Sequence, residues 1–154
     1  MVKKIVIGLL LVIVAIQFYR PEKNISIETP DTDFLVVNGT DANLAATIKA
    51  SCYDCHSNNT AYPWYAEVAP VSWWVANHVN DGKKHFNFSI WDTYSDKKKD
   101  HKLEENIEMI EEKEMPLESY LPMHPEAKLS EEQQKELIAY FKEVKLKINY
   151  TKVE

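Results

Sequence analysis

The chain has 154 residues, 45% of them hydrophobic and 11% aromatic, which is enough for one folded domain and too little for two. Its net charge of −6 argues against a nucleic-acid-binding surface. It contains only three glycines, and no hairpin-turn signature joins two alternating segments, which argues against an all-β fold.

The N-terminal residues 1–19 form the first expected element. Lys3 and Lys4 precede a strongly apolar run from Ile5 to Phe18. Fifteen residues of helix measure about 22 Å, less than the roughly 30 Å hydrocarbon core of a bilayer. Such a run is typical of a signal peptide or of a short signal-anchor whose lysines reach the headgroups. No small-x-small cleavage site follows Ala15, which favours an uncleaved anchor.

The charge around this run predicts the location of the chain. Positive charge on the N-terminal side keeps that end in the cytoplasm. We therefore expect a bacterial cytoplasmic-membrane protein whose remaining residues face the periplasm or exterior. Residues 20–40 are expected to be a linker with an apolar patch at 34–37 that packs on the domain. Residues 41–149 are the expected domain, and 150–154 a tail.

Helical signals dominate residues 41–149. Asp41 can cap a helix that runs through Ile48 into the following cysteine motif. Residues 58–63 break this helix, and Pro70 fits the first turn of a second helix over 71–80. We expect Asp81 and Gly82 to close the second helix.

Two further helices are expected toward the C-terminus. Ser95 or Asp96 can open the third, which must end before Met115-Pro116 because a proline disfavours helix at the preceding residue. The pattern S-E-E-Q at 130–133 is a capping box that opens the last helix. The fold class is therefore all-α, with about four helices and long loops. Long ordered loops in a small domain usually pack against another part of the protein or against a bound group.

Both cysteines of the chain lie in the sequence C-Y-D-C-H, as Cys52, Cys55 and His56. This C-x-x-C-H pattern is the attachment signature of c-type haem. The two thiols reach the porphyrin vinyl groups, and the histidine supplies the proximal iron ligand. A thioredoxin-like redox pair needs a βαβ setting, a structural zinc site needs four ligands, and a simple disulfide is the third alternative. We therefore expect one covalent haem c within a small cytochrome c-like domain.

The sequence does not point to a single residue as the sixth iron ligand. Met115 precedes Pro116, so it lies on an extended loop that can place its thioether over the distal face. Met123 lies on the same loop and is the main alternative. A histidine, with His85 and His124 the first candidates, or an open position are further alternatives. Met109 lies at helical spacing beside Ile107 and Ile110 and is expected in the core.

Aromatic residues crowd the forty positions after the motif. Trp64 and Trp73 are the candidates for packing against the flat apolar face of a porphyrin, although aromatic residues also form the core of any small domain.

Seven stretches together resemble the bacterial haem-binding domain proteins, which are small membrane-anchored relatives of c-type cytochromes. These stretches are QFYRPEKN (17–24), CYDCHSNNT (52–60), PWY (63–65), APVSW (69–73), HFNFS (85–89), EMPL (114–117) and HPEA (124–127). The resemblance implies a single covalent haem on Cys52 and Cys55, with His56 as proximal ligand. It also implies that the methionine of the Met-Pro pair, Met115, is the distal ligand.

These features favour a membrane-tethered electron carrier that exchanges electrons with a partner protein. The alternative is a haem-based ligand-binding or sensor module in which Met115 is displaced or absent from the iron. An enzyme such as a peroxidase is disfavoured because Arg20 is the only arginine, which leaves no distal His/Arg pair.

Overall fold

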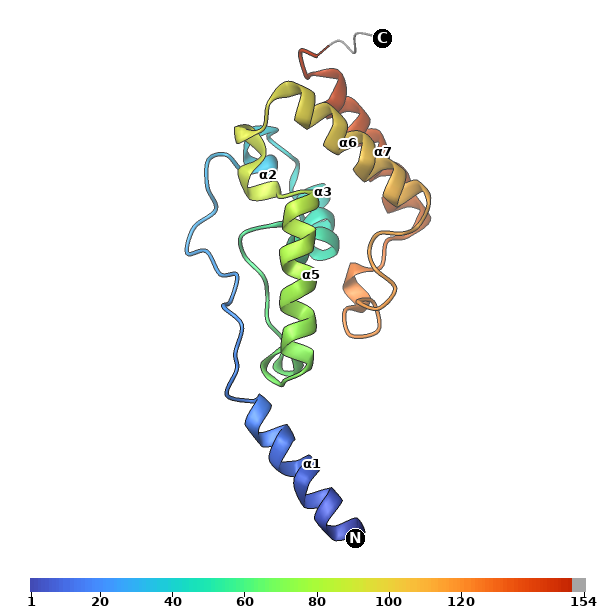
Figure 1. Ribbon diagram of the computed structural model, residues 1–154. Coiled ribbons are helices and arrows are strands. Elements are labelled where there is room, and N and C mark those ends of the chain that lie inside the picture. The colour runs from blue at the N-terminus through green and yellow to red at the C-terminus, as the bar shows by residue number, and fades with distance from the viewer. Residues whose placement is uncertain (151–154) are drawn as a thin grey trace.

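The computed structural model describes residues 1–150 and is helical, without strands, over that range (Figure 1). The all-α prediction is therefore confirmed. Residues 151–154 of the expected tail lie outside the described residues. The α-helices are α1 (Val2–Ile16), α2 (Phe34–Val37), α3 (Ala42–Ile48), α4 (Asp54–His56), α5 (Val71–His85), α6 (Asp96–Glu111) and α7 (Glu131–Leu146). A π-helical turn (Lys49–Tyr53) joins α3 to α4, and 3-10 turns cover Trp64–Glu67, Phe88–Thr93 and Pro125–Ala127.

Local capping explains where the helices begin. The Asp41 carboxylate accepts hydrogen bonds from the backbone N–H groups of Asn43 and Leu44 at 3.0 and 3.1 Å. Ser130 and Gln133 form both bonds of the capping box at the start of α7. Each cap satisfies backbone donors that have no partner within the helix. The predicted starts of α3 and α7 are therefore confirmed.

The predicted end of the second helix is wrong, because α5 continues through Asp81 and Gly82 to His85. Gly82 lies inside the helix, where a Cβ atom on it would come within 2.6 Å of the Cys55 carbonyl oxygen. The glycine therefore allows α5 to pack closely on α4. Its role depends on a tertiary contact, which local sequence signals do not reveal.

The core lies where α6 and α7 pack side by side against α3 and the residues that follow α5 (Figure 1). Phe34 is completely buried and makes edge-to-face contacts with Phe88 and Trp91 at ring-centroid distances of 5.4 and 5.1 Å. Each such buried aromatic contributes on the order of 1.5–3 kcal/mol through the area that it removes from water. The other large side chains of this core include Phe86, Leu103, Leu137 and Phe141.

Residues 20–40, expected to form a linker, follow the surface of the domain and contact it repeatedly. Phe34 and Leu35 of α2 are buried, whereas Val36 and Val37 are exposed. The Asn24 side chain donates to the Ser57 carbonyl and the Thr60 hydroxyl at 2.8 and 2.9 Å. This segment therefore contributes directly to the folded core.

Helix α1 projects away from the rest of the chain, and none of its residues is buried (Figure 1). Across residues 1–150, none of the helices combines the length and apolar character required to span a membrane.

Candidate functional site

The C-x-x-C-H motif lies on one continuous helical segment. Cys52 belongs to the π-helical turn after α3, and Cys55 and His56 belong to α4. The backbone then leaves the helix at Ser57, whose conformation is extended. π-Helical turns inside α-helices are rare and frequently mark functional sites. Here the turn brings Cys52 and His56 to the same cavity.

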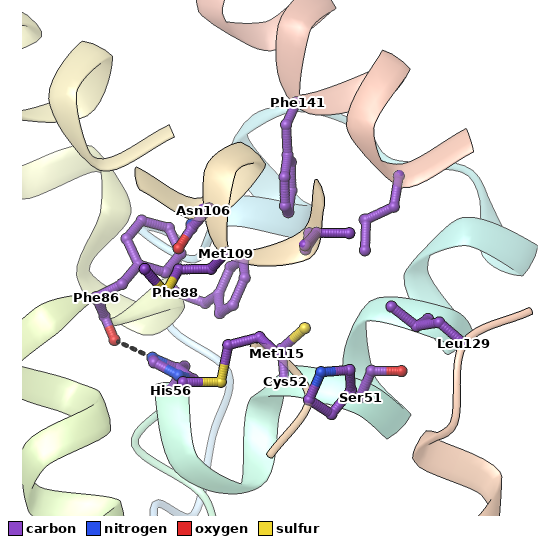
Figure 2. Close-up of a pocket in the computed structure, with 13 residues that line it drawn as sticks. Ser51, Cys52, His56, Phe86, Phe88, Asn106, Met109, Met115, Leu129 and Phe141 are labelled. Atoms are coloured by element: carbon purple, nitrogen blue, oxygen red, sulfur yellow. Dashed lines mark hydrogen bonds between the residues drawn. The ribbon is translucent and has the colours of Figure 1, made fainter. Parts of the chain in front are cut away.

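The His56 imidazole is held by one hydrogen bond to the backbone. Its Nδ1–H donates to the Phe86 carbonyl oxygen at 3.0 Å, just beyond the end of α5 (Figure 2). This bond assigns the tautomer and leaves the Nε2 lone pair available to a metal, as is usual for metal-binding histidines. Burial lowers the pKa of His56, which favours the neutral imidazole that a metal requires.

A mostly apolar cavity lies beside this imidazole. The Met115 side chain extends into the cavity toward His56 (Figure 2). The structure thus brings together three of the predicted site residues, Cys52, His56 and Met115, from segments far apart in the sequence. The remaining lining residues are Ser51, Phe86, Phe88, Asn106, Met109, Ile110, Pro116, Leu129, Leu137 and Phe141.

Asn106 is a polar residue within this mostly apolar lining. Its Nδ2 atom is buried and has no hydrogen-bond partner among residues 1–150. An unpaired buried amide costs about 1–3 kcal/mol of desolvation. Asn106 therefore adds to the lining an amide whose nitrogen has no partner among the described residues, and sequence analysis did not single it out.

The two cysteines are both free thiols. Burial raises the pKa of Cys52 to about 12 and the pKa of Cys55 to about 11, so both thiols are protonated near neutral pH. The structure therefore gives no support to the disulfide alternative. No group of three or more metal-ligating His, Cys, Asp or Glu residues occurs among residues 1–150, so the zinc alternative also lacks support.

Cys55 lies on a second cavity of about 210 Å³, on the other side of the segment after Met115. Pro116 lines the first cavity, whereas Leu117 and Tyr120 line the second. The segment 115–120 therefore borders both cavities, with Cys52 on the first and Cys55 on the second.

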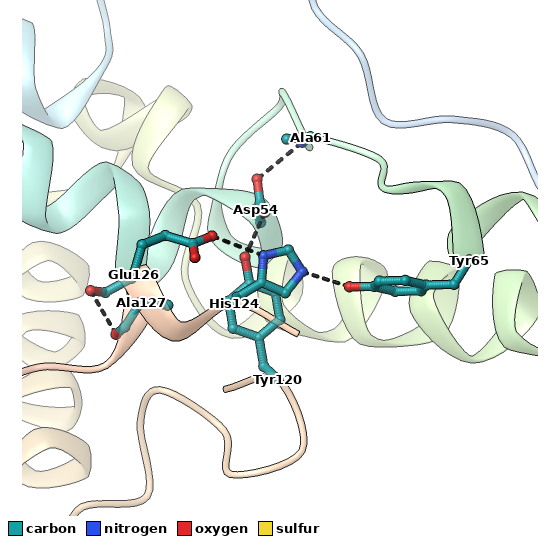
Figure 3. A network of polar contacts seen from close by, with 8 residues as sticks. Asp54, Ala61, Tyr65, Tyr120, His124, Glu126 and Ala127 are labelled. Atoms are coloured by element: carbon teal, nitrogen blue, oxygen red, sulfur yellow. Dashed lines mark hydrogen bonds and ion pairs between the residues drawn. The ribbon is translucent and has the colours of Figure 1, made fainter. Parts of the chain in front are cut away.

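Both residues between the two cysteines hold other parts of the chain. The Tyr53 hydroxyl donates to Asp33 at 2.8 Å, and the Tyr120 hydroxyl donates to Asp54 at 2.6 Å (Figure 3). Asp33 precedes α2, and Tyr120 belongs to the loop that carries Met115. The motif is thus tied to the N-terminal segment on one side and to the Met115 loop on the other. No sequence signal links Tyr120 to Asp54, which lie 66 residues apart.

A second polar contact holds the Met115 loop (Figure 3). Tyr120 stacks on His124 with ring centroids 3.9 Å apart and an interplanar angle of 7°. The Tyr65 hydroxyl donates to His124 Nε2 at 2.6 Å, and His124 Nδ1–H donates to Glu126 at 3.2 Å. Both ring nitrogens of His124 are therefore occupied, which argues against His124 as an iron ligand.

The other predicted residues lie outside the first cavity. Met123 is exposed and lines the second cavity. Trp64 is also exposed, and the Trp73 indole donates to the Tyr19 carbonyl at 2.9 Å, close to the end of α1. Met109 was expected in the core, but it is only half-buried and lines the first cavity with His56 and Met115.

The residues of the first cavity fit a haem by the chemistry of their donors. They offer an imidazole with a free Nε2, a thioether, one thiol of the C-x-x-C pair and a mostly apolar lining with no charged side chain. The second thiol, Cys55, lines the neighbouring cavity. Among comparisons with known proteins, no curated protein and no solved structure matches the chain. The support for a haem comes from a family model. A family model described as a haem-binding domain matches residues 11–143, so the chain belongs to the haem-binding domain family.

Proposed function

We propose that the chain carries one covalently attached haem and transfers electrons. Cys52 and Cys55 hold the porphyrin through thioether bonds, His56 is the proximal iron ligand, and Met115 is the distal one. The observation that carries this proposal is the His56 imidazole, fixed through Nδ1 and facing the Met115 side chain in one apolar cavity.

Each residue has a distinct role in this proposal. The Phe86 carbonyl orients the imidazole and makes it a better electron donor to a metal. Phe86, Phe88 and Phe141 exclude water from the cavity. Haem iron bound by imidazole and thioether supplies one-electron redox chemistry, at a higher potential than iron bound by two imidazoles. For electron transfer, the protein then has to hold the two iron ligands in place and leave one edge of the haem accessible to a redox partner protein.

We further propose that α1 attaches the protein to the bacterial cytoplasmic membrane, with the domain on the periplasmic or outer side. Lys3 and Lys4 precede the apolar residues of α1, and every residue of that helix is accessible. The uncleaved helix therefore serves as a short anchor whose lysines reach the cytoplasmic headgroups.

One observation favours a second candidate function, a haem-based ligand-binding or sensor module. The Asn106 amide lines the cavity and its Nδ2 atom has no partner among residues 1–150, so rotation of the amide would let it donate a hydrogen bond to a ligand bound there. In this alternative, His56 would hold the iron, Met115 would be displaced or absent from it, and the haem would supply a position that binds a small ligand.

The test is to express the full chain with haem-maturation machinery and to measure its intact mass and absorption spectrum. Covalent attachment predicts the polypeptide mass plus one haem. Methionine ligation predicts a methionine-to-iron charge-transfer band in the oxidised protein, whereas rapid carbon monoxide binding to the reduced protein would favour the sensor. A mass equal to that of the polypeptide alone, without Soret absorption, would refute both candidates.

A further inference from the structure

Helix α1 is joined to the haem-binding domain by specific hydrogen bonds. The Gln17 side chain, directly after α1, accepts from the Ala69 N–H at 2.9 Å and donates to the Ala69 carbonyl at 3.1 Å. The Trp73 indole donates to the Tyr19 carbonyl, and the Tyr19 and Trp73 rings meet edge to face. The domain therefore has a defined orientation on α1.

Charged residues reinforce this junction. Glu67 pairs with Lys23 and lies 3.9 Å from Arg20, so the carboxylate on the domain faces two cations just after α1. These pairs are partly exposed and each contributes little alone. Together they neutralise the one acidic side chain in the 3-10 turn at this end of the domain.

The same end of the domain exposes large apolar side chains. Trp64 is 75% exposed and Trp74 46% exposed, and Val68 and Val71 between them are also exposed. We call these four residues the basal patch. Trp64 opens the 3-10 turn before α5, Val68 directly follows that turn, and Val71 and Trp74 lie in the first turn of α5. Helix α5 begins at the end of the domain nearest to α1 (Figure 1).

We propose that the basal patch lies in the headgroup region of the phospholipid bilayer that holds α1. This inference rests on the proposed membrane attachment of α1. Gln17 bonds directly to Ala69, so Val68 and Val71 lie at the depth at which α1 ends. Tryptophan is enriched at that depth because its ring is apolar and its N–H is polar.

The length of α1 is consistent with this placement. Its 15 residues measure about 22 Å, and a hydrocarbon core measures roughly 30 Å. A helix that is too short draws adjacent apolar groups toward the bilayer. Phe18, Tyr19 and the basal patch are the groups next to its end.

The proposal has a consequence for the haem cavity. Helix α5 begins at the basal patch and ends one residue before Phe86, whose carbonyl holds His56. The 15 residues of α5 place these two points about 22 Å apart. The first cavity is thereby separated from the basal patch by about the length of α5, whereas the second cavity, which Val71 and Trp74 line, lies next to the patch.

The experiment uses the full haem-loaded chain, labelled with 5-fluorotryptophan, in phosphatidylcholine nanodiscs. Fluorine signals are assigned by single Trp→Phe variants and compared with and without a lipid that carries a nitroxide near its headgroup. We expect the nitroxide to broaden the Trp64 and Trp74 signals and to leave the signal of Trp91, which is buried in the core, unchanged.

A charge in the basal patch provides the matched variant. Val68→Asp should reduce the broadening of Trp64 and Trp74 while α1 still carries the protein to the nanodisc. Leu146→Asp, at a more exposed apolar position at the end of α7, should leave the broadening unchanged. An unchanged Trp91 chemical shift in each variant verifies the fold.

Two outcomes would overturn the inference in different ways. If the chain enters nanodiscs but Trp64 and Trp74 are broadened no more than Trp91, the basal patch does not contact lipid, and membrane attachment still stands. If the chain does not associate with nanodiscs at all, the proposed attachment through α1 fails as well.

Discussion

The two sides of the candidate haem cavity are built differently. On the His56 side, the proposed ligand lies on a helix, its ring is hydrogen-bonded to the backbone at Phe86, and Gly82 brings α5 into contact with Cys55. On the Met115 side, the proposed ligand lies on the connection between α6 and α7, outside any helix. This connection is held by side-chain hydrogen bonds such as that of Tyr120 and by backbone hydrogen bonds such as that from the Met115 N–H to the Met109 carbonyl oxygen.

This difference separates two properties of the site. Close packing on the His56 side resists displacement, because any shift must disturb two helices at once. Polar contacts on the Met115 side each contribute only about 1 kcal/mol, so they can be rearranged at low cost. Substitutions on the His56 side should therefore decide whether the protein retains haem. Substitutions on the Met115 side should alter which side chain ligates the iron.

The largest effect is expected from removing both thiols. Cys52→Ala combined with Cys55→Ala should yield protein whose haem is extracted into acid acetone, because no thioether bond remains. The unsubstituted chain, treated in the same way, should retain its haem. Haem that stays with the double variant would show that attachment occurs elsewhere.

Removing the distal thioether should leave haem attached but change the iron. Met115→Ala should give a high-spin spectrum or a lower reduction potential, since the sixth ligand is lost. Met123→Ala is the matched control, because Met123 lies on the same loop but lines the other cavity. If the control changes the spectrum and Met115→Ala does not, Met123 is the ligand.

A methyl group at Gly82 tests the packing on the His56 side. Gly82→Ala places a Cβ about 2.6 Å from the Cys55 carbonyl oxygen, so α4 and α5 must separate. Overpacking of this kind costs about 1–3 kcal/mol, which urea unfolding can measure. Gly8→Ala makes the same change in α1, where nothing lies within 4 Å, and should not destabilise the domain. Equal stability of the two variants would contradict the close contact.

Local sequence signals predicted those parts of the fold that local interactions determine. Asp41 and Ser130 cap helices through atoms within three residues, so the starts of α3 and α7 could be found without tertiary information. The C-x-x-C-H pattern likewise identified Cys52, Cys55 and His56, of which Cys52 and His56 line the first cavity and Cys55 lines the second. By contrast, the end of α5 was predicted wrongly because Gly82 serves a contact with another helix.

The contacts that hold the site together could not be predicted, because they join residues far apart in the sequence. Tyr120 and Asp54 are 66 positions apart, and Gln17 and Ala69 are 52 apart. Nothing in the side chains themselves indicates which hydroxyl meets which carboxylate. Asn106 was missed for a similar reason, since its importance lies in a partner that the other described residues do not provide.

A smaller effect is expected from the hydroxyl that ties the Met115 loop to the motif. Tyr120→Phe removes its hydrogen bond to Asp54 but keeps the ring that stacks on His124. The loop should loosen by about 1 kcal/mol, which corresponds to roughly fivefold faster carbon monoxide binding if loop opening limits the rate. Tyr19→Phe removes a hydroxyl outside the site and is the control. An unchanged rate in Tyr120→Phe would show that this bond does not hold Met115 in place.

The smallest effect is expected at Asn106. Asn106→Leu replaces a buried amide whose Nδ2 has no partner among residues 1–150 with an apolar side chain of similar size. If Nδ2 also lacks a partner in the haem-loaded carrier, the free energy of unfolding should stay constant or rise by up to about 1 kcal/mol, because an unpaired donor is removed. Urea unfolding of the loaded protein measures this change. A loss of more than 1 kcal/mol, or a fall in carbon monoxide affinity, would show that Asn106 donates to a group inside the cavity. The Met115 side would then bind a ligand in addition to supplying a ligand to the iron.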